Sequence, residues 1–146
     1  MARWPQWARI AAGIAGVLLL VVFGATLWFR GQVTQVREAT PALQAEGREF
    51  GSGRAGGECV QKALGRRLER TDGGVAGAVA DRIFLTACLE ASTPDRTFCR
   101  GVPGPMQIGE TIEWRRTECA NRGYTDPACG RLLAAVQAHC HGAARG

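Results

Sequence analysis

Residue types that commonly carry chemistry are scarce in this chain. The only serines are Ser52 and Ser92, and the only histidines are His139 and His141. A serine nucleophile needs an adjacent base, and neither serine has one, so a serine hydrolase is not expected. No C-x-x-C pair is present either, which argues against a zinc ribbon, a thioredoxin-type centre and covalent haem attachment.

Charge is absent from residues 10–29, a run of uncharged and mostly apolar residues. A helix needs about 20 such residues to cross a hydrocarbon core roughly 30 Å thick. A soluble helix that is apolar on every face would need a larger protein around it than this chain supplies. We therefore expect a transmembrane helix at residues 10–29, with the lipid bilayer as its partner.

A cleaved signal peptide is the alternative for this segment. Such a peptide has 7–15 apolar residues followed by small residues at the cleavage site. Here the run is longer and ends in large residues, with tryptophans on both sides that suit the two membrane interfaces: Trp4, Trp7 and Trp28. We expect a retained signal-anchor, and a secreted domain after cleavage stays the alternative.

Cysteine is missing before residue 59 and frequent after it. An even number of cysteines in a small exported domain predicts a disulfide framework. Residues 57–142 are therefore expected in an oxidising compartment and residues 1–9 in the cytoplasm. Arginine greatly outnumbers lysine, which we take as the mark of a GC-rich bacterial genome, so the expected location is the inner membrane with a periplasmic domain. The six cysteines are Cys59, Cys88, Cys99, Cys119, Cys129 and Cys140.

The net charge of +5 does not predict nucleic-acid binding. Two of these charges precede the span, and residues 57–146 hold twelve basic and ten acidic residues. Nucleic-acid binding calls for clustered, unbalanced positive charge. No nucleic-acid partner is expected.

Helical periodicity predicts an all-α fold, with one N-terminal transmembrane helix followed by a small disulfide-stapled four-helix domain. The expected helices cover residues 58–70, 75–91 and 105–122, and a fourth starts with Asp126 as N-cap and Pro127 in its first turn. Apolar residues three and four apart mark the buried faces. The third helix is expected to bury Ile108, Ile112 and Cys119, and residues 143–146 form a tail.

Residues 30–56 are expected to be a juxtamembrane connector. Its first part extends the span as a helix, and residues 51–57 form a flexible glycine-rich joint. Heptad-like spacing from Val33 to Phe50 would let two copies pair. Pro41 interrupts that pattern, so a homodimer is only weakly supported.

The short turns between the predicted helices suggest how the cysteines pair. Residues that face each other in an antiparallel hairpin have position numbers with a constant sum. The turn near residue 124 brings Cys119 to Cys129, and the turn near residue 73 brings Cys59 to Cys88. Cys99 and Cys140 remain, so we predict these three pairs among the 15 possible connectivities.

The loop at residues 97–106 is the segment that favours partner binding. It carries apolar side chains on a proline-containing loop tethered by a cysteine, and rigid loops of this kind often bind partners. A tryptophan in the following helix would extend the surface. The alternative is that these residues close the open end of the bundle. The candidates are Phe98, Val102, Met106 and Trp114.

No catalytic or metal site emerges from the remaining residues. His139 and His141 flank Cys140, but neighbours on a helix point in different directions and Cys140 is expected in a disulfide. Glu110 and Glu113 lie beside arginines and suit a solvated face. We expect a non-enzymatic accessory protein without cofactor or metal that contacts another membrane or periplasmic protein. A redox or metal-binding factor is the alternative.

Overall fold

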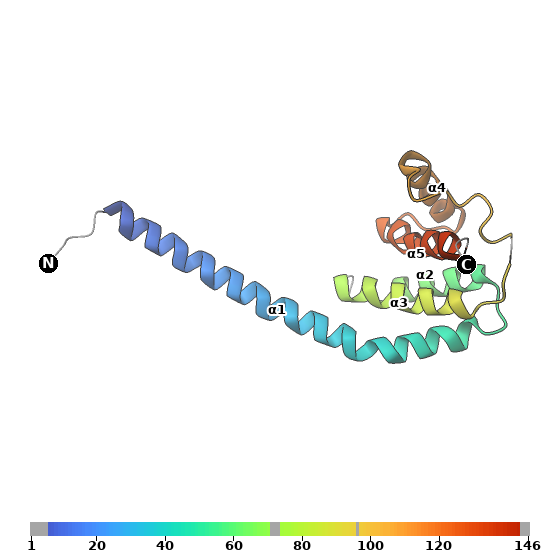
Figure 1. The fold of residues 1–146 in the computed structure, drawn as a ribbon, viewed down its shortest axis with the longest axis horizontal. Helices are drawn as coiled ribbons and strands as arrows, with labels where there is room; N and C mark the ends of the chain where they lie inside the picture. Colours follow the sequence, from blue (N-terminus) through green and yellow to red (C-terminus); the bar gives the residue numbers. More distant parts are fainter. Residues whose placement is uncertain (1–5, 71–73, 96, 144–146) are drawn as a thin grey trace. The chain divides into compact units, whose positions relative to one another are not determined.

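A computed structural model describes residues 6–70, 74–95 and 97–143, and Figure 1 shows its helices. In these residues the chain is helical without a β-strand, so the all-helical prediction is confirmed. The chain divides into two compact units, Met1–Gln35 and Val36–Gly146, and each is described by itself. The helices are α1 (Gln6–Gly51), α2 (Gly56–Glu69), α3 (Val75–Ala91), α4 (Ile108–Asn121) and α5 (Pro127–Ala143).

The first unit contains the apolar part of α1. The segment Ala12–Gly31 is long and apolar enough to cross a membrane, judged by length and composition. Its large aliphatic side chains are exposed, and side chains of this kind leave water favourably. A membrane anchor and a signal sequence both have these properties.

The core of the second unit lies between α2, α3 and α5. Helix α3 packs against both α2 and α5, while α4 packs against α5. Burial of each large aliphatic or aromatic side chain contributes roughly 1.5–3 kcal/mol. A core this small leaves only a modest surplus over chain entropy. The largest fully buried apolar side chains are Phe84, Leu64, Leu85, Leu89 and Leu133.

The start of α5 follows directly from its sequence. The Asp126 side chain accepts a hydrogen bond of 2.7 Å from the Ala128 N–H, and Pro127 is the first helical residue. An aspartate at this position satisfies an N–H that has no partner inside the helix, and proline there loses nothing. The predicted N-terminus of this helix is confirmed.

The last turns of α1 pack against α3, where the sequence predicted a helical extension followed by a flexible joint at residues 51–57. A Cβ on Gly47 would lie 2.5 Å from the Phe84 carbonyl oxygen, and a Cβ on Gly51 would overlap the carbonyl of Cys88. Glycine at both positions allows the two backbones to come this close. The second compact unit begins at Val36, and these last turns of α1 belong to it.

Further contacts hold this end of α1 in place. The rings of Phe50 and Phe84 have centroids 6.2 Å apart, and the Thr93 N–H donates a 2.8 Å hydrogen bond to the Arg54 carbonyl. Helix α1 also continues through Pro41, which was expected to interrupt it. A proline inside a helix removes one hydrogen bond, and the contacts with α3 in the turns that follow offset this loss.

Helix α4 is shorter than predicted, and its apolar stripe is buried only at one end. Cys119 is 7% exposed, but Ile108 is 72% and Ile112 is 58% exposed. All three lie at helical spacing on one side of the helix. The prediction that the two isoleucines are buried was wrong, because among α2 to α5 only α5 packs against α4.

The close packing at Gly51 yields a stability prediction. Replacing Gly51 by alanine forces α1 and α3 apart and should lower the free energy of unfolding by roughly 1–3 kcal/mol. Gly65→Ala is the matched control, because a Cβ there meets no atom within 4 Å. That change should raise stability by about 0.5–1 kcal/mol. Urea unfolding of the full chain in detergent measures both, and equal stability of the two variants would contradict the packing.

Candidate functional site

Three disulfides join segments that are distant in sequence. Cys59 pairs with Cys88 across α2 and α3, Cys119 with Cys129 across α4 and α5, and Cys99 with Cys140 between the loop and the end of α5. These are the three pairs that the hairpin spacing predicts. The structure therefore contains no free cysteine. Cys59 and Cys88 are fully buried in the core, and only Cys99 is partly accessible.

The loop before α4 turns most of its apolar side chains inward. Phe98 and Val102 are half-buried and pack against the core. The Phe98 ring covers Gly56, where a Cβ would lie 3.0 Å from the ring, and meets the His139 ring edge-on at 6.4 Å. The structure thus places two of the predicted partner-binding side chains against the core at the end of the bundle.

A local turn precedes this loop. The Asp95 carboxylate accepts hydrogen bonds from both the N–H and the hydroxyl of Thr97, each at 2.7 Å. These bonds, chiefly the one from the Thr97 hydroxyl, lower the pKa of Asp95. A turn of this type directs the chain toward Phe98 and Cys99.

The contact between α4 and α5 is largely polar and centres on Gln137 of α5, which sequence reasoning missed. Gln137 is buried; its amide donates to the Pro103 carbonyl at 2.8 Å and to the Thr111 hydroxyl at 3.0 Å. Its oxygen accepts from Arg115 Nη2 at 2.7 Å. Trp114, also predicted to bind a partner, is half-buried against the core. A lone glutamine in the apolar stripe of residues 132–140 was the available signal.

The outer surface of α4 carries uncovered apolar side chains. Met106 is 90% exposed, and it is followed by the exposed Ile108 and Ile112. We call these three residues the α4 patch. Of the predicted partner-binding residues, only Met106 belongs to it. The two isoleucines were assigned to the core because periodicity identifies an apolar face without saying what covers it.

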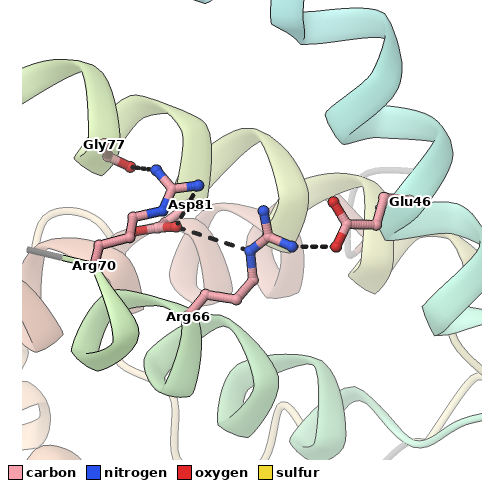
Figure 2. Close-up of polar contacts among 5 residues, drawn as sticks. All are labelled: Glu46, Arg66, Arg70, Gly77 and Asp81. Carbon is pink, nitrogen blue, oxygen red and sulfur yellow. Dashed lines mark hydrogen bonds and ion pairs between the residues drawn. The ribbon is translucent and has the colours of Figure 1, made fainter. Parts of the chain in front are cut away.

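A buried carboxylate links the end of α1 with α2 and α3, as Figure 2 shows. Asp81 on α3 is 1% exposed; its Oδ1 lies 3.7 Å from Arg70 Nη2 and 4.0 Å from Arg66 Nε. Arg66 also pairs with Glu46 of α1, and Arg70 Nη1 donates to the Gly77 carbonyl at 3.5 Å. We call Glu46, Arg66, Arg70 and Asp81 the Asp81 cluster.

The Asp81 cluster suits a structural role. A buried carboxylate is tolerated when cations and hydrogen-bond donors surround it, and the Arg66 guanidinium also stacks over the Phe84 ring at 4.4 Å. Both carboxylates of the cluster pair with arginines, and no histidine belongs to the cluster. Sequence reasoning missed it, although an aspartate within the apolar pattern of residues 75–91 was visible.

The histidines do not form a metal site in the part of the chain that the structure describes. His139 packs against Phe98, and His141 Nε2 lies 2.8 Å from the Pro103 carbonyl oxygen. Among the described residues, no group of three or more His, Cys, Asp or Glu side chains is placed to hold a metal ion. Glu113 pairs with Arg116 at 3.5 Å on the exposed surface.

The Cys99–Cys140 disulfide should control the loop more than the helices. We expect Cys99→Ser with Cys140→Ser to lower stability by about 2–4 kcal/mol, to preserve the helical circular dichroism signal, and to speed tryptic cleavage after Arg100. The matched pair Cys119→Ser with Cys129→Ser should instead speed cleavage after Arg122. Mass spectrometry of timed digests reads out both sites. Equal protection of Arg100 in the two variants would refute this role.

The Asp81 cluster should contribute far more to the free energy of unfolding than an exposed ion pair does. Replacing Asp81 by alanine leaves Arg66 and Arg70 facing each other without the carboxylate and should cost roughly 3 kcal/mol. Glu113→Ala removes the exposed pair with Arg116 and should cost about 0–1 kcal/mol. Denaturant titration of the full chain in detergent compares the two. A loss at Asp81 no larger than that at Glu113 would rule out a structural role for the cluster.

Comparisons with known proteins found no relative of this chain. The chain matches no family model, and no curated protein or solved structure is significantly similar to it.

Proposed function

We propose that the chain is a single-pass membrane protein whose disulfide-stapled domain binds another protein outside the cytoplasm. The observation that carries this proposal is the α4 patch. Ile108 and Ile112 are exposed on α4, whose contact with α5 is largely polar, and the exposed Met106 lies just before this helix. Soluble monomers seldom expose clustered apolar side chains without a binding role.

The arrangement of α4 suits an exposed binding element. The predicted apolar stripe runs from Ile108 to Cys119; its C-terminal end is buried against α5 and its N-terminal end is open. The open end of this stripe is therefore an apolar surface that a partner protein can cover. Burial of one isoleucine contributes roughly 1.5–3 kcal/mol, so two such side chains make a substantial anchor for a partner.

Rigid attachment of α4 further favours binding. The Cys119–Cys129 disulfide fixes its C-terminal end, and the Gln137 hydrogen bonds fix the preceding loop at Pro103 and the helix at Thr111. A surface ordered before it meets its partner loses less entropy on binding. The side chains nearest the isoleucines also include Arg115 and Arg116, so the expected partner surface is apolar with polar groups at its edge.

The proposed location follows from the anchor and the disulfides. Most of residues 10–29 lie within Ala12–Gly31, the segment of α1 that is long and apolar enough for a membrane span. Three disulfides favour an oxidising compartment for the domain. We place the N-terminus in the cytoplasm and the Val36–Gly146 unit in the periplasm, anchored to the inner membrane. The partner is then another membrane or periplasmic protein.

Photo-crosslinking tests the proposal in intact cells. A photoreactive amino acid at position 112 should yield a discrete adduct with a second protein, and the adduct should remain in the membrane fraction after an alkaline wash. Adding Ile108→Asp should abolish it, because a carboxylate in the patch opposes burial. Position 117, exposed on another side of α4, is the matched control and should yield no such adduct.

Three results would overturn this proposal. They are no protein adduct from position 112, an equal adduct from position 117, and recovery of the chain in the alkaline wash. An adduct between two copies of the chain would replace the accessory role with self-association.

A further inference from the structure

A second surface, formed on α3, differs from the α4 patch in its chemistry. Two hollows of about 400 Å³ and 240 Å³ lie side by side along this helix and share Val79 and Arg82 among their lining residues. One opens toward α5 and the other toward the last turns of α1. We call the continuous surface the α3 groove, and no residue of α4 lines it.

The floor of the groove is an uncovered stripe of α3. Val75 is 77% and Val79 is 39% exposed, and Ile83, Thr86 and Glu90 continue the stripe at steps of four, three and four residues. At 1.5 Å per residue the stripe is about 22 Å long. That length matches a docked helix of about 15 residues, whose apolar side chains would recur at the same spacing.

The sides of the groove carry positive charge. Arg82 and Arg131 are exposed beside the apolar floor of the larger hollow, and Arg48 lines the smaller one. The acidic residues lining the groove are Asp81, which is buried and faces Arg66 and Arg70, and Glu90 at the far end. A ligand in the larger hollow therefore meets aliphatic side chains flanked by guanidinium groups.

We propose that the α3 groove binds an acidic amphipathic helix of a partner protein. Aliphatic side chains of that helix would lie on Val75, Val79 and Ile83. Carboxylates on its flank would meet Arg82 and Arg131, which bind such groups in a bidentate manner. This interaction goes beyond the proposed function, since it names a different surface and the chemistry of its partner.

The dimensions favour a helix over an anionic lipid. A phospholipid needs room for two long acyl chains next to its phosphate, whereas the larger hollow is lined in part by the short side chains of Ala78 and Ala128. The stripe extends along the axis of α3 with side-chain spacing that matches a second helix. Arginines at intervals along the rim also suit several separate carboxylates better than one phosphate.

Peptide binding to the full chain tests the proposal. The chain is reconstituted in nanodiscs of zwitterionic lipid, and the probe is a fluorescein-labelled synthetic helix of about 15 residues, with leucines three and four apart and glutamates on its flanks. We expect the peptide to raise the fluorescence anisotropy, with affinity falling as salt is added. Arg82→Glu with Arg131→Glu should weaken binding by about tenfold or more.

Matched controls distinguish peptide binding in this groove from an effect of the overall charge of the chain. Lys62→Glu with Arg100→Glu makes the same charge change at exposed residues outside the groove and should leave binding within about twofold. Val75→Ser with Val79→Ser should weaken binding while keeping every charge. The same peptide with lysine in place of glutamate should not bind.

Several results would overturn the proposal. They are failure of the glutamate peptide to bind, equal binding of the lysine peptide, and an equal loss in the Lys62 and Arg100 control. Phosphatidylglycerol vesicles that bind through Arg82 and Arg131, while the peptide does not, would assign the groove to lipid instead. None of these outcomes bears on the adduct from position 112, so the α4 patch is tested independently.

Discussion

Cys59 and Cys88 lie at the centre of the core, and the other two disulfides fasten the parts that the core does not hold. Among α2 to α5, helix α4 packs only against α5, and the loop before it forms no helix or strand. In a unit this small, hydrophobic burial alone leaves a narrow margin. The disulfides Cys119–Cys129 and Cys99–Cys140 hold α4 and its preceding loop on the domain. Helix α4 can therefore make polar contacts with α5 and leave its apolar side chains exposed.

The end of α1 is joined to the domain by different means. Gly47 and Gly51 let its backbone lie directly on α3, and Glu46 reaches the Asp81 cluster through Arg66. Backbone contact of this kind tolerates no added side chain. The ion pairs also fix how the end of α1 is oriented on α2 and α3. The turns of α1 that follow Val36 thus belong to the folded unit rather than to a loose tether.

The two candidate binding surfaces differ in a way that suits different partners. The α4 patch is a row of exposed apolar side chains at the start of α4, and the α3 groove is an apolar hollow flanked by arginines. An exposed apolar row needs a complementary apolar surface on its partner. A concave charged groove selects a helix with carboxylates beside its apolar face.

The sequence by itself determined the helices, the apolar N-terminal segment and the cysteine pairing, because these depend on local periodicity, capping and hairpin spacing. Asp126 and Pro127 start α5 whatever surrounds it, and position sums brought the cysteines together in the right pairs. Burial was decided only by the tertiary structure. Ile108 and Ile112 have the spacing of core residues but are exposed, and Gly51 suggests the start of a flexible joint until α3 is seen against it. Periodicity identifies a face, whereas the packing of neighbouring helices decides whether that face is covered.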